Sequence, residues 1–111
     1  MKISKKIPQK IYTLTQAIKP DISKNTSFDE AWDIISEYSG LEGELRTTHK
    51  TKKTIFILLK SDKEIETFEW DNKEVFKEAE GDWDWTKILS VVLEYIIKNK
   101  IVKKPRKKRL L

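Results

Sequence analysis

The chain has 111 residues, of which 38% are hydrophobic and 37% are charged, with a formal net charge of +5. This composition is typical of one small folded domain rather than of a disordered chain, and no apolar run approaches the length of a membrane span. Because there is no cysteine and only one histidine, His49, disulfides, thiolate metal sites and multi-histidine sites are excluded. We therefore expect no metal and no cofactor.

Two short helices are predicted in the N-terminal third of the chain. Apolar residues spaced four, three and four apart indicate a helix over residues 8–18, which a proline ends. Ser27 and Glu30 have the spacing of a capping box, and the apolar periodicity that follows predicts a second helix over residues 28–38, ended by Gly40.

Three strands are predicted next, as an antiparallel meander. They cover the segments rich in β-branched and aromatic residues at 44–48, 54–60 and 64–70. The middle strand is apolar on both faces, so we expect it to be central and covered on both sides. Ile65 is out of phase with the aromatic residues that follow it, which predicts a β-bulge near Thr67.

The last element is a long helix with a broad apolar surface. Residues 73–79 predict one or two helical turns, after which the helix begins near Trp85 and runs to about Lys104, where Pro105 ends it. Its apolar circumference predicts either deep burial or contact with a partner, including a second copy. The predicted fold is α+β, with this helix packed on the sheet, one domain over residues 1–104 and a mobile basic tail over 105–111.

Charge is distributed unevenly along the chain. Residues 1–20 hold five basic and no acidic residues, and residues 98–111 hold eight basic and no acidic residues. Residues 21–97 hold ten basic and eighteen acidic residues. Basic ends on an acidic body favour binding to a polyanion.

A basic hairpin turn and the basic C-terminal run are the predicted contacts to nucleic-acid phosphates. The tail can instead be a solvated end or a nuclear address, and lysines at a turn also protect an edge strand from aggregation. The predicted contacts are Arg46, Lys50, Lys52 and Lys53 of the hairpin and Lys98, Lys100, Lys103, Lys104, Arg106, Lys107, Lys108 and Arg109 of the C-terminal run.

An acidic segment rich in tryptophan separates the strands from the last helix. Its carboxylates repel phosphate, so core packing is a better prediction for its indoles than stacking on bases. The alternative is a surface for a basic protein partner, or for the basic tail itself. The residues concerned are Trp70, Trp83, Trp85, Asp82 and Asp84.

The order helix, three strands, helix over residues 28–99 is similar to that of a double-stranded-RNA-binding domain. That family places a lysine cluster where this chain reads Asp82-Trp83-Asp84-Trp85-Thr86-Lys87. Topology alone assigns no function, so no family is assigned.

The leading prediction is a small intracellular protein, not an enzyme, that binds DNA or RNA through phosphate contacts with weak sequence selectivity. It is expected in the cytoplasm or nucleoid, or in the nucleus in a eukaryotic or viral setting, without a membrane partner. The alternative is a protein-interaction module, such as an inhibitor, immunity or assembly factor, that uses the acidic tryptophan segment and the last helix.

Overall fold

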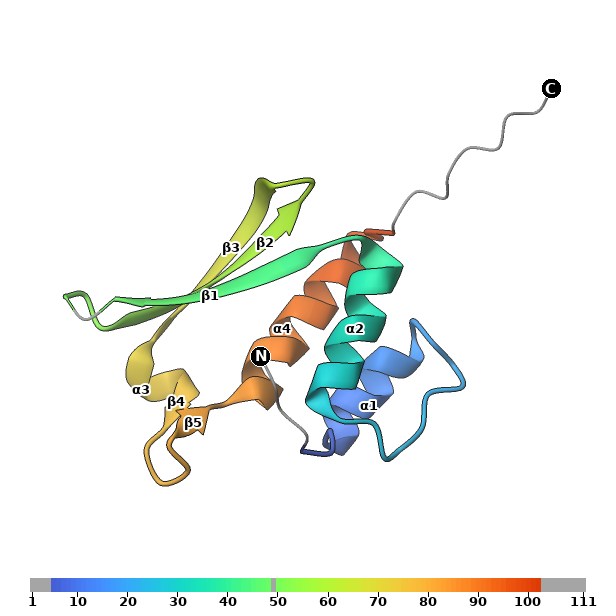
Figure 1. Ribbon diagram of the computed structural model, residues 1–111, viewed down its shortest axis with the longest axis horizontal. Helices are drawn as coiled ribbons and strands as arrows, with labels where there is room; N and C mark the ends of the chain where they lie inside the picture. The colour runs from blue at the N-terminus through green and yellow to red at the C-terminus, as the bar shows by residue number, and fades with distance from the viewer. Residues whose placement is uncertain (1–4, 49, 103–111) are drawn as a thin grey trace.

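Three helices lie on one side of a three-stranded antiparallel sheet in the computed structural model, which describes residues 5–48 and 50–102 (Figure 1). The helices are α1 (Gln9–Gln16), α2 (Phe28–Ser39) and α4 (Trp85–Lys98), and the strands are β1 (Glu42–Thr48), β2 (Lys53–Lys60) and β3 (Lys63–Asp71). The predicted α+β class is confirmed, including the order of its elements.

The predicted capping box sets the start of α2. Ser27 Oγ accepts the N–H of Glu30 at 3.2 Å, and Glu30 Oε1 accepts the N–H of Ser27 at 2.9 Å. The helix ends where Gly40 adopts a left-handed φ of 75°, a conformation that costs glycine little. α2 is thus determined by local sequence at both ends.

The predicted bulge in β3 lies two residues earlier than expected. The pairing of β2 with β3 shifts between Leu58 and Leu59, which leaves Ile65, rather than a residue near Thr67, as the extra residue. Both aromatic side chains of β3 are packed against the core, whereas Ile65 is 38% exposed. The bulge therefore lets the aromatic residues face the helices.

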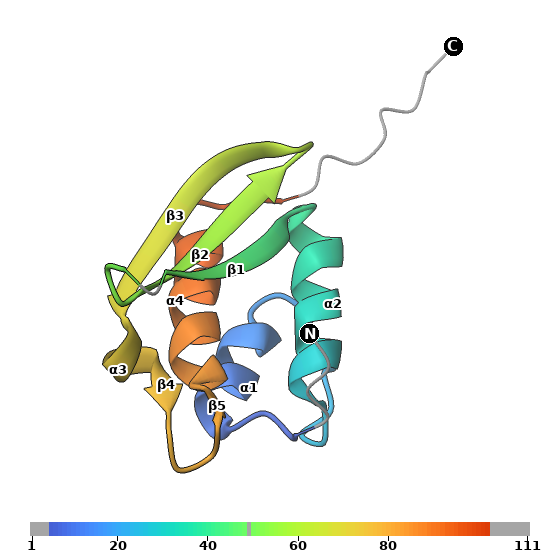
Figure 2. The ribbon, with the colours of Figure 1, turned by 60° about the vertical axis from the view of Figure 1, so that its left-hand side comes forward.

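Among residues 5–48 and 50–102, helices cover only one face of β2, which corrects the prediction that both faces would be covered. Phe56 and Leu58 belong to the core under the helices. In Figures 1 and 2 no described helix lies over the opposite face. Ile57 on that face is still only 4% exposed, because its cross-strand neighbours Glu44 and Thr67 flank it.

The core is centred on α4, which packs against α1, α2 and the sheet (Figure 2). Its fully buried residues are Ile88, Leu89, Val92, Leu93 and Ile96. Deep burial within its own chain thus accounts for the broad apolar surface of this helix. A partner or second copy docked on α4 stays a prediction.

α4 ends at Lys98 rather than near Lys104, because Lys100 adopts a left-handed φ of 50°. Two backbone hydrogen bonds then close the helix in a Schellman motif: Lys100 N–H to the Ile97 carbonyl at 3.2 Å, and Ile101 N–H to the Ile96 carbonyl at 3.0 Å. Ile101 packs against the core. Ile101, whose apolar side chain is compatible with a longer helix, is therefore part of the C-terminal cap of a shorter helix.

Replacing Lys100 with glycine is expected to raise the free energy of unfolding by roughly 0.5–1 kcal/mol, because glycine avoids the steric cost of the left-handed conformation. Urea denaturation measures this change. Lys98→Gly is the matched control, since Lys98 is helical, and it is expected to lower the same free energy by about 0.5–1 kcal/mol. A loss of stability in both variants would contradict the assignment.

One of the predicted helical turns at 73–79 is present, and the rest of that segment belongs to a short hairpin. A single-turn helix, α3 (Asn72–Val75), is followed by a short hairpin of β4 (Phe76–Lys77) and β5 (Asp82–Trp83). Phe76 and Trp83 pack edge to face across this hairpin, with ring centroids 4.6 Å apart. None of the described helices is long and apolar enough to cross a membrane.

Candidate functional site

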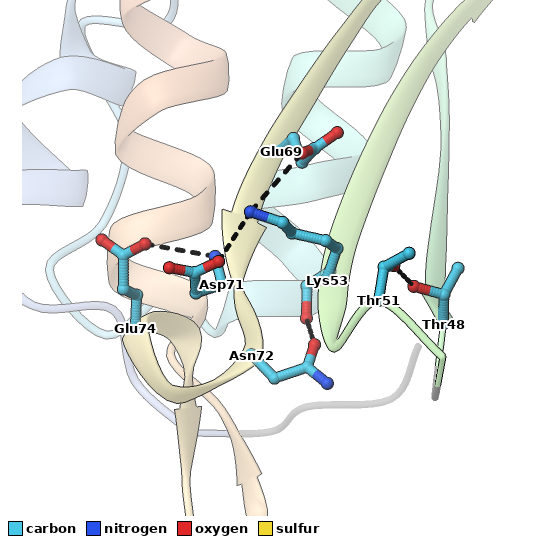
Figure 3. Close-up of polar contacts among 8 residues, drawn as sticks. Thr48, Thr51, Lys53, Glu69, Asp71, Asn72 and Glu74 are labelled. Carbon is cyan, nitrogen blue, oxygen red and sulfur yellow. Dashed lines mark hydrogen bonds and ion pairs between the residues drawn. The ribbon is translucent and has the colours of Figure 1, made fainter.

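The basic hairpin, residues 46–53, contains two cations that are held by carboxylates of the same chain. Arg46 Nε lies 2.6 Å from Glu44 Oε2. Lys53 Nζ lies 2.7 Å from Asp71 Oδ1 and 3.8 Å from Glu69 Oε2 (Figure 3). These contacts neutralise part of the charge that the sequence assigns to phosphate binding.

The same contacts shift the pKa values of the paired groups. The hydrogen bond from Lys53, together with its charge, lowers the pKa of Asp71, and the bond to Asp71 raises the pKa of Lys53. Likewise the hydrogen bond and charge of Glu44 raise the pKa of Arg46. Each shift indicates that the folded state favours the charged form.

Asp71→Asn is expected to reduce the loss of stability in acid. Because the pKa of Asp71 is below its ordinary 3.8 in the folded state, its stabilising effect is present above about pH 4 and is lost as pH falls through the lower value. Urea denaturation at several pH values measures this. Lys53→Met removes the same pair and is expected to reduce the loss of stability in acid similarly. A decrease in the free energy of unfolding with falling pH as large as that of the wild type, in either variant, would contradict the assignment.

The tip of the basic hairpin is held against α3. Thr54 Oγ1 donates to Asn72 Oδ1 at 2.6 Å, and the Asn72 N–H donates to the Lys52 carbonyl at 2.9 Å. The hydroxyls of Thr48 and Thr51 form a hydrogen bond across the turn (Figure 3). These bonds join the start of β2 to α3 and link Thr48 to Thr51.

Two hairpin lysines and two lysines of the C-terminal run are exposed. Lys50, Lys52, Lys98 and Lys100 form no ion pair with any residue in the described ranges. The hairpin tip lies where β1 ends, whereas α4 ends near the start of β1, about 20 Å away for a strand of this length (Figures 1 and 2). The predicted contacts outside the described residues are Lys103, Lys104, Arg106, Lys107, Lys108 and Arg109.

A second site lies between α2, β1 and the start of α4. It is a groove of about 490 Å³, here called the aromatic groove, in which Trp32 and Phe56 meet edge to face with ring centroids 5.8 Å apart. Its lining residues are Asp29, Trp32, Asp33, Gly43, Leu45, Phe56, Trp83 and Trp85.

Gly43 makes room for the rings in this groove. A Cβ atom at this position would lie 2.4 Å from Phe56 Cζ and 2.9 Å from Trp32 Cζ2. Those separations are too short for unbonded carbon atoms, so any side chain would displace both rings. The close approach of β1 to the aromatic residues therefore depends on glycine.

The chemistry of the aromatic groove suits a cationic side chain. Indole faces attract ammonium and guanidinium groups, and the carboxylate of Asp33 adds a charge of the opposite sign. A carboxylate repels phosphate. The electrostatics of the groove are therefore more favourable for a cation than for an anion.

The predicted tryptophans separate in the fold. Trp83 and Trp85 line the aromatic groove, whereas Trp70 stacks on Phe68 elsewhere against the core. Core packing is confirmed for Trp85, which is 9% exposed, and the other two are partly buried against the core. The buried Nε1–H of Trp85 has no acceptor in the described part of the chain.

The two predicted aspartates have structural partners. Asp84 caps α4, accepting the Lys87 N–H at 3.2 Å. Asp82 accepts the N–H of Trp83 at 2.7 Å. Within residues 5–48 and 50–102, no group of three or more acidic or histidine side chains could hold a metal ion.

Sequence reasoning missed the contribution of α2 to the aromatic groove. Trp32 belongs to the apolar periodicity that predicts a helix over residues 28–38, and no role was predicted for Asp29 or Asp33. The available signal was a pair of carboxylates four residues apart beside a tryptophan, which share a helix face. The role of Gly43 depends on tertiary packing and has no local signal.

Comparison of the chain with protein-family models, curated proteins and solved structures found no match. Functional interpretation therefore depends on the geometry of the two candidate sites.

Proposed function

We propose that this protein is a protein-interaction module that binds a basic segment of a partner protein in its aromatic groove. The observation that supports this most directly is the convergence of three tryptophans and the carboxylate of Asp33, from α2, β5 and α4, on one groove. We expect this encounter inside the cell.

Two features make this proposal stronger than the nucleic-acid prediction. Arg46 and Lys53 are paired with carboxylates of their own chain, so they offer little free positive charge. The hairpin tip and the end of α4 lie at opposite ends of the sheet (Figures 1 and 2), so the exposed lysines of the hairpin are separated from those at the end of α4.

The proposal is tested with a heptapeptide of alternating lysine and valine, titrated against the protein while tryptophan fluorescence is recorded. Asp33→Asn is expected to weaken binding about fivefold, the loss of one exposed ion pair of roughly 1 kcal/mol. Glu37→Gln removes the same charge from the same helix outside the groove and is expected to leave the affinity unchanged. Equal affinity of the wild type and Asp33→Asn would reject the groove as the site.

Nucleic-acid binding is the second candidate function. It is favoured by the eight basic residues without an acidic one over residues 98–111 and by the exposed Lys98 and Lys100. For binding to duplex DNA or RNA, the logarithm of the binding constant falls linearly with the logarithm of the salt concentration. Deleting residues 103–111 is then expected to reduce the magnitude of this slope by several units. Failure to bind either nucleic acid at low salt would leave the interaction module as the only candidate.

A further inference from the structure

We infer that the basic segment binds as an additional strand along the free edge of β1, an inference that rests on the proposed function of the aromatic groove. The sheet order β1-β2-β3 leaves β1 at an edge. Among the described residues, no backbone hydrogen bond joins its outer side to another segment. An open row of N–H and C=O groups is a template for an extended peptide.

β1 is better suited to strand addition than the opposite edge. Its seven residues pair with β2 without a register shift and include no proline. β3, in contrast, carries the bulge at Ile65, which interrupts the regular spacing of an edge. The regular edge is also the one beside the aromatic groove, since Gly43 and Leu45 belong to β1 and line it.

The two faces of an added strand define the chemistry of the ligand. Side chains alternate between the faces of a sheet, so every second side chain would lie beside the aromatic groove. The others would lie beside Glu42, Glu44 and Arg46 on the opposite face of β1, where Arg46 is paired with Glu44 and Glu42 forms no ion pair within the described ranges. Charge complementarity at the aromatic groove, through Asp33, therefore favours an extended segment that contains lysine or arginine.

Amide hydrogen exchange of the full-length protein, followed by NMR, tests this mode of binding. The probe is the same heptapeptide of alternating lysine and valine, and its matched control carries N-methyl groups on all of its backbone amides. The control keeps the side chains and charge but has no backbone N–H to donate to β1 from either edge. We expect the unmodified peptide to slow exchange at alternate amides of β1 and to bind about tenfold more tightly than its control.

The outcomes separate the inference from the function on which it rests. Equal binding of both peptides, with a loss of affinity in Asp33→Asn, would overturn strand addition and leave the groove as the site. Binding of neither peptide would overturn both. Protection of the β1 amides by duplex DNA or RNA instead of the peptide, or a dimer formed by the protein alone through β1, would also overturn the inference.

Discussion

Leu93→Ala is expected to lower the free energy of unfolding by about 2–5 kcal/mol. Leu93 is fully buried in α4, where that helix contacts the rest of the core, so truncation removes apolar contacts and leaves a cavity. A loss of this size is a large fraction of the stability of a small domain. Urea denaturation followed by tryptophan fluorescence and circular dichroism measures it.

Val102→Ala is the control for this prediction, because Val102 is 43% exposed and its truncation is expected to change stability by less than about 0.5 kcal/mol. The denaturation midpoint of the wild type is expected to be independent of protein concentration. A midpoint that rises with concentration, together with a small effect of Leu93→Ala, would indicate that α4 is an intermolecular surface rather than the core.

Gly43→Ala is expected to lower the free energy of unfolding by about 1–3 kcal/mol and to weaken peptide binding about tenfold or more. The added methyl group would overlap the rings of Phe56 and Trp32, so the strand or the rings must move. Movement of the rings changes the wall of the aromatic groove. Denaturation and the fluorescence titration with the heptapeptide report the two effects separately.

A double mutant distinguishes this overlap from a general effect of replacing glycine. In the Phe56→Leu background the nearest ring atom is removed, so Gly43→Ala is expected to cost less stability than in the wild type. Additive losses in the double mutant would show that the packing between Gly43 and Phe56 is not responsible.

The elements that sequence predicted best are those fixed by short-range interactions. Ser27, Glu30 and Gly40 determine α2 because all their decisive hydrogen bonds and backbone angles lie within the helix itself. The predicted end of α4 was wrong because an apolar residue at position 101 fits either a further helical turn or the hydrophobic contact of a Schellman motif. Only packing against the core decides between the two.

The candidate sites were less predictable because they depend on partners distant in sequence. Lys53 and Asp71 are eighteen residues apart and meet through the register of β2 and β3. Charge counting along the chain therefore overestimated the positive charge of the basic hairpin. The aromatic groove similarly needs Trp32 of α2 beside Trp83 and Trp85, an arrangement that no local pattern specifies.

The bulge at Ile65 has a consequence for the stoichiometry of any assembly formed through the sheet. With a regular edge at β1 and an interrupted edge at β3, strand addition is favoured at β1 and disfavoured at β3. The bulge therefore works against stacking of this sheet into a filament through both of its edges.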